Sequence, residues 1–343
     1  MMQTKIIKLK SLEDKYILDT LKDAIKKNEL VIFPTETVYG IGADALSPLA
    51  SKNIYMAKNR PSDNPLIVHI ASKSDLDQYV KNIPLKANQL IDAFWPGPLT
   101  MIFDKSDLVP YETTGGLETV AIRMPDHIGA LKLIESCGPL AAPSANISGK
   151  PSSTEFKHVF NDFNGKVSYI IDGGKTLIGL ESTVIDVRDQ VTLLRPGAIT
   201  KTMIETVLEE KILDHSKDRP TDLVLSPGMK YAHYKPLGNV TLLKGDVLKV
   251  LQFLNALEED IKINQCIITV DDYAQIFKDY KVSLLGKISD SKEIGHNLFS
   301  SLRLMDEWAI EHIYIYLNET DEYSQTIMNR LLKASGYQVI DFS

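Results

Sequence analysis

An aperiodic segment between Lys211 and Lys235 places the strongest constraint on how this chain folds. It is rich in charged and turn-forming residues and follows neither the period of a helix nor that of a strand, which is typical of a linker. The chain has 343 residues, about twice the usual length of one domain. We therefore expect a domain at 1–210, a linker at 211–237 and a second domain at 238–343.

Before the linker, short apolar strands are mixed with helical patterns. Leu18, Leu21 and Ile25 share one face of a predicted helix at 18–28. The apolar run 30–33 then predicts a buried strand that Pro34 ends. Further strands are predicted at 66–70, 99–103, 120–124, 169–171, 184–187 and 191–194, and helices at 76–80, 87–94 and 128–136. This mixture predicts an α/β domain with a twisted, mixed sheet.

After the linker, strands and helices alternate. Strands are predicted at 240–243, 266–270, 282–285, 313–317 and 337–340, and helices at 247–257, 293–308 and 324–334. Such alternation is typical of a parallel sheet with crossover helices. We therefore expect a second, smaller Rossmann-like α/β domain.

Composition narrows the class of protein. The two cysteines, Cys137 and Cys266, lie far apart without a CxxC partner, which argues against a disulfide framework and a cysteine-based zinc site. The first residues lack the apolar core of a signal peptide, and no apolar run approaches the roughly 20 residues that span a bilayer. A cytoplasmic protein with no membrane association is expected.

The charge distribution argues against direct binding of nucleic acid. The formal net charge is −7, and residues 1–200 hold 22 Lys and Arg against 23 Asp and Glu. The remaining residues hold 16 against 22. Neither part has the basic excess of a protein that binds backbone phosphates, so any connection to RNA is expected to be indirect.

Polar residues gather where predicted strands begin or end. Residues 34–42, PTETVYGIG, follow a buried strand directly, and ligands in open α/β sheets lie beyond the carboxyl ends of strands. A plain strand-ending turn explains this segment equally well. Lys58 and Arg60 suit an anionic phosphate chain, although the same pair standing alone is usually solvated surface charge.

Arg123 lies in an otherwise apolar predicted strand, where a charge is costly unless it is paired or faces a polar cleft. It either clamps a substrate carboxylate or forms an internal ion pair. Residues 141–149 and 181–183 supply small polar groups, and Arg195 follows a further strand. The four cations Lys58, Arg60, Arg123 and Arg195 are predicted in loops or at strand ends, where their convergence would form an anion site.

Seven sequence blocks within the first 200 residues resemble one known family. In chain order they read PTETVYGIGADA, KNRPSDNPLIVH, WPGPLT, TVAIRMP, APSANISG, ESTVIDV and LLRPG. In this order they closely resemble the YrdC-like family of threonylcarbamoyl-AMP synthases. The segment SPGMKYAHYKP at 226–236 resembles the linker of two-domain members, which carry an additional Rossmann-like C-terminal domain.

The resemblance implies a deep, positively charged cavity and assigns residues to it. The positions that match threonine-binding residues are Thr35, His69, Arg123 and Ser182. Those that match residues around ATP or its adenylate are Lys58, Arg60, Ser62, Asn64, Thr119, Ser144, Asn146 and Arg195. Tyr231 and Tyr234 match linker tyrosines that reach over the active site, and Tyr234 is counted with the ATP-binding residues. The residues expected to act in catalysis are Lys58, Arg60, Arg123 and Arg195.

The activity that the resemblance implies is formation of threonylcarbamoyl-AMP and pyrophosphate from L-threonine, bicarbonate or CO2, and ATP. This nucleotidyl transfer serves the synthesis of N6-threonylcarbamoyladenosine in tRNAs that read ANN codons, through a downstream threonylcarbamoyl transferase complex. Mg2+ is expected to enter with ATP rather than on protein ligands. Three other classes stay open: an RNA-binding module, a carbamoyl-phosphate-dependent carbamoyltransferase, and a regulatory nucleotide-binding protein without turnover.

Overall fold

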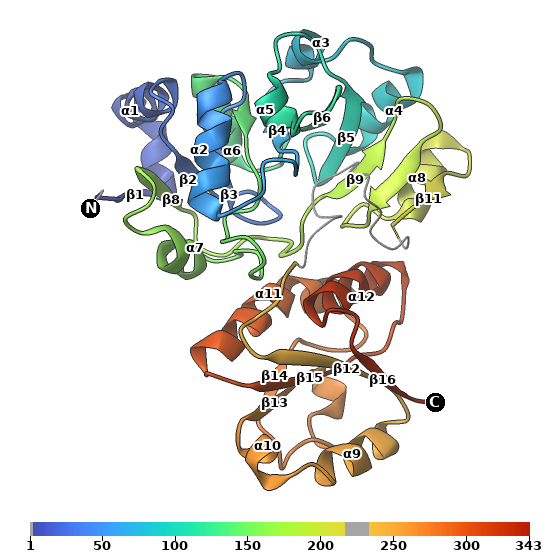
Figure 1. Ribbon diagram of the computed structural model, residues 1–343. Helices are drawn as coiled ribbons and strands as arrows, with labels where there is room; N and C mark the ends of the chain where they lie inside the picture. Colours follow the sequence, from blue (N-terminus) through green and yellow to red (C-terminus); the bar gives the residue numbers. More distant parts are fainter. Residues whose placement is uncertain (1–2, 217–232) are drawn as a thin grey trace. The chain divides into compact units, whose positions relative to one another are not determined.

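The computed structural model of this chain describes residues 3–216 and 233–343 (Figure 1). These residues form two compact units. The first unit contains residues 3–148, 153–177 and 181–216, and the second contains residues 149–152, 178–180 and 233–343. Two short segments from the first 200 residues, Gly149–Ser152 and Ile178–Leu180, thus belong to the second unit.

The first unit is built on one mixed sheet, with the strand order β1-β8-β2-β3-β7-β4-β6-β5-β9-β10-β11. The strands are β1 (Lys5–Lys8), β2 (Val31–Phe33), β3 (Gly40–Asp44), β4 (Ile67–His69), β5 (Leu99–Asp104), β6 (Thr119–Arg123), β7 (Leu140–Ala141), β8 (Tyr169–Asp172), β9 (Thr183–Asp186), β10 (Thr192–Arg195) and β11 (Leu213–Asp214). Pairs β4–β6 and β5–β9 are parallel, whereas β2–β3 and β5–β6 are antiparallel. The predicted mixed α/β fold is confirmed.

Helices connect and cover these strands. They are α1 (Lys15–Lys26), α2 (Pro48–Lys58), α3 (Leu76–Tyr79), α4 (Leu85–Phe94), α5 (Tyr111–Thr114), α6 (Ile128–Cys137), α7 (Phe156–Phe163) and α8 (Lys201–Leu208). The predicted helices correspond to α1, α3, α4 and α6. The sequence patterns did not predict α2, α5, α7 and α8.

Strand β2 shows how the sheet separates two apolar cores. Successive side chains of a strand point to opposite faces. Val31 and Phe33 belong to a cluster with residues of α1 and α6, whereas Ile32 belongs to the larger core on the other face. All three are fully buried, so β2 is buried on both faces. This explains why its sequence is a continuous apolar run rather than an alternating one.

The second unit is a parallel five-stranded sheet with the order β14-β13-β15-β12-β16. Its strands are β12 (Asn239–Gly245), β13 (Gln265–Thr269), β14 (Val282–Leu284), β15 (His312–Tyr316) and β16 (Val339–Phe342), and its helices are α9 (Val247–Asn255), α10 (Glu259–Ile263), α11 (Ser291–Glu307) and α12 (Glu322–Ala334). Figure 1 shows α11 and α12 on one face of this sheet and α9 and α10 on the other. The predicted Rossmann-like arrangement is confirmed.

Within residues 3–216 and 233–343, none of the helices has the length and apolar character that crossing a membrane requires.

Candidate active site

The turn between β2 and β3 is the first part of the candidate site. The hydroxyl of Thr35 donates to the carbonyl oxygen of Val38 at 2.6 Å and accepts from the backbone N–H of Thr37 at 3.2 Å. It also lies 2.8 Å from the hydroxyl of Thr37. These local bonds fix the turn, and both threonines are buried. Thr35 therefore shapes the loop that presents Glu36 and Thr37.

Arg123 is the last residue of β6, and its guanidinium contacts the same turn. Nη1 donates to the hydroxyl of Thr37 at 2.9 Å, and Nη2 lies 2.6 Å from Oε1 of Glu36. Nε donates to the carbonyl oxygen of Gly97 at 3.3 Å. Arg123 thus forms the internal ion pair that was one of the two interpretations of its sequence position. A role of Arg123 toward a substrate stays a prediction.

His69 is the last residue of β4 and pairs in register with Arg123. Nδ1 lies 3.1 Å from the carbonyl oxygen of Ile67. A backbone hydrogen bond also joins the ring to Leu140. Burial, and then the charge of Arg123, lower the pKa of His69 to about 3. The imidazole is therefore neutral at physiological pH and can serve a ligand without adding charge.

Ser182 and Arg195 form a second group of buried contacts. Arg195 ends β10, and its Nε and Nη2 donate to the carbonyl oxygen of Ser182 at 3.1 and 2.9 Å. Nη2 also lies 3.2 Å from the Ser182 hydroxyl, which is 2.8 Å from the hydroxyl of Thr100 in β5. Strand β5 pairs with both β6 and β9, so it connects this group to the strand that carries Arg123.

The glycine of the LRPG block permits this arrangement. A Cβ atom at Gly197 would lie 2.3 Å from the backbone nitrogen of Thr183 and 2.8 Å from the carbonyl carbon of Ser182. Real side chains do not approach backbone atoms so closely. The loop after Arg195 can therefore pass the Ser182 backbone only with glycine at this position.

Lys58 belongs to a third group, at the end of α2. Ser47 caps the helix by accepting from the N–H of Ala50, and Pro48 occupies its first turn. Asn59 closes it in the left-handed region with φ of 53°. This geometry buries Lys58, which is 1% exposed. Its prediction as a loop residue is wrong, because the sequence pattern did not reveal α2.

The ammonium of Lys58 holds the loop that follows β7. It donates to the carbonyl oxygen of Ser144 and to that of Asn146, the latter at 2.7 Å. The hydroxyl of Ser144 donates to the side-chain oxygen of Asn146 at 2.6 Å. The backbone N–H of Ser148 in turn donates to the carbonyl oxygen of Lys58 at 2.9 Å. Three residues predicted to surround ATP are therefore in direct contact.

Arg60 and Asn64 form a neighbouring group. Nε and Nη2 of Arg60 each lie 3.3 Å from the carbonyl oxygen of Asn64, and Nη2 is 3.2 Å from that of Pro65. The hydroxyl of Tyr55 also donates to Asn64 at 3.2 Å, and burial raises the pKa of Tyr55 to about 12. The side-chain oxygen of Asn64 is buried without a hydrogen-bond partner. An acceptor in that state is available to a ligand that donates.

The remaining predicted residues are placed differently. Thr119 begins β6, four residues from Arg123, a separation of about 13 Å along a strand. Ser62 is exposed and lines a surface cavity that also includes Gly115 and Gly116. Tyr234 is buried and packs on Phe299 of α11 with 5.1 Å between ring centroids. Tyr231 lies outside the described residues.

Sequence reasoning missed the acidic and hydroxyl partners of the cations. Glu36, Thr37 and Thr100 were not assigned a role, although they contact Arg123 or Ser182. Glu36 and Thr37 lie beside Thr35 in the PTET block, so a search for an acidic partner to the strand arginine could have found Glu36. Thr100 had no such signal.

In the described part of the chain, no group of three or more His, Cys, Asp or Glu residues is arranged to hold a metal ion.

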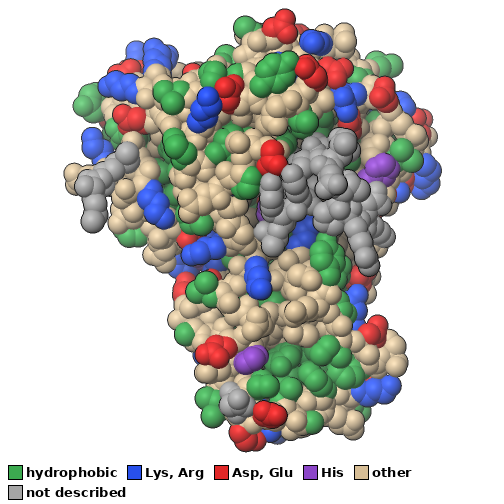
Figure 2. Space-filling view, viewed as in Figure 1, with side chains coloured by type: hydrophobic (Ala, Val, Ile, Leu, Met, Phe, Trp, Pro, Cys, Tyr) green, Lys and Arg blue, Asp and Glu red, His purple; other side chains and the backbone are tan. Residues whose placement is uncertain are grey.

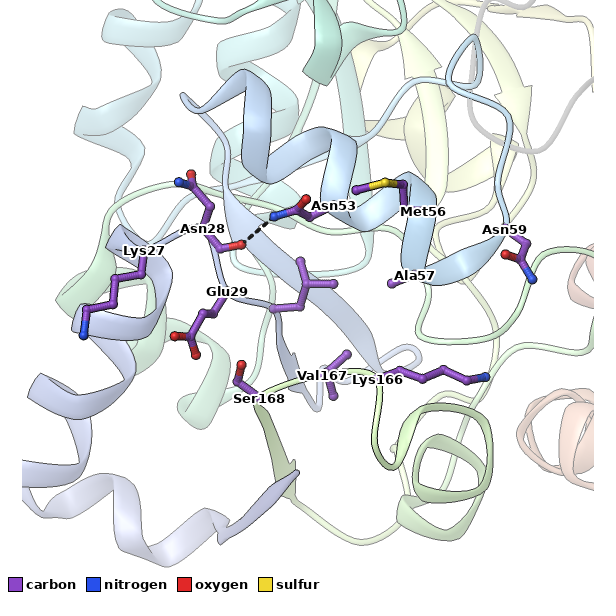
Figure 3. Close-up of a pocket in the computed structure, with 11 residues that line it drawn as sticks. Lys27, Asn28, Glu29, Asn53, Met56, Ala57, Asn59, Lys166, Val167 and Ser168 are labelled. Atoms are coloured by element: carbon purple, nitrogen blue, oxygen red, sulfur yellow. Dashed lines mark hydrogen bonds between the residues drawn. The ribbon is translucent and has the colours of Figure 1, made fainter. Parts of the chain in front are cut away.

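A separate cavity of about 590 Å3 lies between the end of α1, α2 and the segment before β8 (Figure 3). Figure 3 shows Lys27, Asn28 and Glu29 on one side and Met56 and Asn59 on another. The amide of Asn53 donates to the carbonyl oxygen of Asn28 at 3.0 Å within it. The predicted site residues do not line this cavity.

Comparisons with known proteins identify the family of this chain. A family model described as telomere recombination (Sua5_yciO_yrdC) matches residues 23–197, and a model of the threonylcarbamoyl-AMP synthase C-terminal domain (Sua5_C) matches residues 199–336. The chain belongs to the Sua5/YciO/YrdC family and has the two-domain architecture of its Sua5 members.

Relatives match along nearly the whole chain. The threonylcarbamoyl-AMP synthase of Pyrococcus abyssi is 47% identical over 319 residues, which cover 92% of this chain and 93% of that protein. The enzyme of the same name from Bacillus subtilis is 43% identical, with 92% of each chain covered. A crystal structure of P. abyssi Sua5 complexed with L-threonine superposes with a TM-score of 0.91, at 44% identity, and covers 99% of this chain and 100% of that one.

Proposed function

We propose that this chain is a threonylcarbamoyl-AMP synthase. The threonine nitrogen attacks the carbon of CO2, from bicarbonate, to form a carbamate and release a proton. A carbamate oxygen then attacks the α-phosphorus of ATP, and the bond to pyrophosphate breaks. The observation that carries this proposal is that Lys58 and Ser144 both contact Asn146, and that Arg195 contacts Ser182, within a domain that matches the Sua5/YciO/YrdC family model.

The threonine end of the site is proposed at Thr35, His69, Arg123 and Ser182. Arg123 and His69 are the last residues of the adjacent parallel strands β6 and β4. A cation and an uncharged donor or acceptor on rigid strands orient a small zwitterion well. Ser182, held through Arg195, would fix the opposite side of the substrate.

The ATP end is proposed at Lys58, Arg60, Asn64, Ser144, Asn146 and Arg195. Lys58 and Arg195 are both buried, and buried cations stabilise charge on phosphate oxygens more strongly than solvated ones do. Thr119, Ser62 and the tyrosines Tyr231 and Tyr234 are kept in this proposal from the family resemblance alone. We assign Tyr231 and Tyr234 to a lid over the bound substrates.

Mg2+ is proposed to enter as the ATP complex, where it neutralises phosphate charge and demands few protein ligands. The product is proposed to pass to a threonylcarbamoyl transferase complex that modifies tRNA, in the cytoplasm. Direct RNA binding is not favoured. Figure 2 shows the coloured acidic and basic side chains interspersed over the visible face of the first unit, whereas backbone binding calls for a continuous basic surface.

Pyrophosphate release from Mg-ATP tests the proposal when L-threonine, bicarbonate and carbamoyl-phosphate are omitted in turn. Release that requires both threonine and bicarbonate is the expected result. Release with threonine alone would indicate ordinary aminoacyl-adenylate formation, and release with carbamoyl-phosphate in the absence of threonine would indicate a carbamoyltransferase. No release in any mixture would favour a binding role without turnover.

A further inference from the structure

Glu36 is a buried carboxylate: Oε1 forms an ion pair with Arg123, and Oε2 has no hydrogen-bond donor. The residue is 4% exposed. Nη2 of Arg123 approaches Oε1 to 2.6 Å, yet neither Glu36 oxygen nor that nitrogen makes a hydrogen bond of acceptable geometry. A buried ionised carboxylate normally has its lone pairs occupied by donors, because leaving them empty is costly. Such an exception in a candidate site calls for an explanation.

Glu36 lies among the residues that are proposed to bind the amino-acid substrate. It lies between Thr35 and Thr37, and Arg123 contacts both Glu36 and Thr37. A free amino acid carries a carboxylate and an ammonium group on the same carbon atom. The Arg123–Glu36 pair presents a cation and an anion in contact, which is the complementary arrangement of charge.

We propose that Glu36 binds the ammonium group of the amino-acid substrate while Arg123 binds its carboxylate. This inference rests on the proposed function and adds to it a residue that selects an α-amino acid. The ammonium supplies three N–H donors, and Oε2 of Glu36 supplies a vacant acceptor. Charge-assisted hydrogen bonds of this kind are short and strong.

The two histidines near Glu36 are uncharged. His69, beside Arg123, is neutral because burial and the arginine lower its pKa to about 3. Burial likewise lowers the pKa of His127, against the smaller opposing effect of the Glu36 charge. Neither imidazole therefore supplies a positive charge to Glu36 near pH 7. The positive charge of Arg123 balances the negative charge of Glu36, so the empty site does not bury an isolated anion.

A cycle that changes both protein and ligand tests the proposal. Calorimetric titration gives the Kd of L-threonine and of 3-hydroxybutanoate, which keeps the carboxylate and hydroxyl but lacks the amino group. The Kd of 3-hydroxybutanoate divided by the Kd of L-threonine measures how much the ammonium group contributes to binding. We expect that ratio to fall about 10- to 100-fold in Glu36→Gln, the usual range for losing a hydrogen bond to a charged group. Glu36→Asp, which keeps the charge, should retain a larger ratio than Glu36→Gln.

Glu112→Gln is the matched control. Glu112 is a half-buried glutamate of the same unit that pairs with Lys52 at 3.4 Å, and its loss should leave the ratio unchanged. If Glu36→Gln weakens both ligands by the same factor, Glu36 is only structural and the proposal is overturned. If wild-type protein does not bind threonine at all, the proposed function itself fails, and the inference with it.

A crystal structure of the wild-type protein with L-threonine provides a test that does not depend on whether the variants fold. The threonine nitrogen should lie within hydrogen-bond distance, about 3 Å, of a Glu36 oxygen. A nitrogen directed away from Glu36, with threonine bound through other groups, would overturn the inference and leave the proposed function intact.

Discussion

Arg195 is joined to Ser182 at two atoms: its Nε and Nη2 donate to the Ser182 carbonyl oxygen at 3.1 and 2.9 Å, and Nη2 also reaches the hydroxyl at 3.2 Å. Both residues are buried. The planar guanidinium therefore fixes both the backbone and the side chain of Ser182, which is proposed to bind the substrate L-threonine. In the proposed function, Arg195 orients this serine and also acts on phosphate.

Replacement of Arg195 by lysine should show whether its hydrogen bonds to Ser182 matter beyond its positive charge. Lysine keeps the charge but cannot form the two-pronged contact to one carbonyl. We expect kcat/KM for threonine-dependent pyrophosphate release to fall about 10- to 100-fold, as is usual when one hydrogen bond to a charged group is lost. Steady-state kinetics with threonine varied at saturating Mg-ATP will measure it.

Arg188→Lys is the control for this substitution. Arg188 follows β9 and pairs with Asp186 at 2.8 Å and with Asp104 at 3.4 Å. These ion pairs include none of the proposed substrate-binding residues, so its replacement should leave kcat/KM within about 2-fold. Equal losses in both variants would mean that Arg195 acts through general stability.

Lys58 offers a second test, directed at the ATP end. Lys58→Met keeps the length of the side chain but removes the donor shared by the carbonyl oxygens of Ser144 and Asn146. Two buried acceptors would lose their donor, and the loop that presents Ser144 would loosen. We expect the Kd for ATP to rise at least 10-fold. Fluorescence titration with a labelled ATP analogue measures that change.

Lys26→Met in α1 of the same unit is the comparison for Lys58. Lys26 is the last residue of α1, is exposed, and is not among the proposed ATP residues. The ATP affinity of this variant should match that of wild type. Retention of ATP binding by Lys58→Met would remove Lys58 from the proposed nucleotide site.

The fold was predictable where a strand is apolar throughout or a helix has a clear apolar face. Strand β2 and helix α1 meet these conditions. Helix α2 was missed because its buried positions include Ser51 and Lys58, which interrupt the apolar pattern. Strand β3 was missed because two of its five residues are glycines, which have low strand propensity.

The site was predictable to the extent that its cations stand out in the sequence. Arg123 was found because a charge in an apolar strand is conspicuous. The identity of its partner depends on how the β2–β3 turn approaches the end of β6, and neither periodicity nor composition determines such a tertiary contact. Glu36 was therefore not assigned, although the internal ion pair itself was one of the two interpretations considered.

Arg303 of α11 provides a prediction about the second unit. Its Nε and Nη2 donate to the carbonyl oxygen of Pro151 at 3.1 and 2.7 Å, and Arg303 is buried. Arg303→Ala should leave that carbonyl without these donors and create a cavity, at a cost of about 2–4 kcal/mol. Hydrogen exchange should then accelerate at Gly149–Ser152. Lys292→Ala, an exposed change on the same helix, should leave exchange in this segment unchanged.

The low pKa of His69 predicts how stability depends on pH. In the native state the pKa of His69 is about 3, against 6.5 as the ordinary value. Between these values the unfolded chain binds more protons than the native one, so stability falls as the pH falls from 6.5 toward 3. At pH 5 the difference of about 1.5 pH units corresponds to roughly 2 kcal/mol. His69→Gln cannot take up this proton, so its free energy of unfolding should decline less between pH 7 and pH 5, by about that amount.

Guanidinium unfolding of both proteins at the two pH values measures the difference. The contributions of the other histidines, which both proteins share, cancel. Parallel declines would show that His69 titrates normally and that its ring is not buried as the contacts of β4 require.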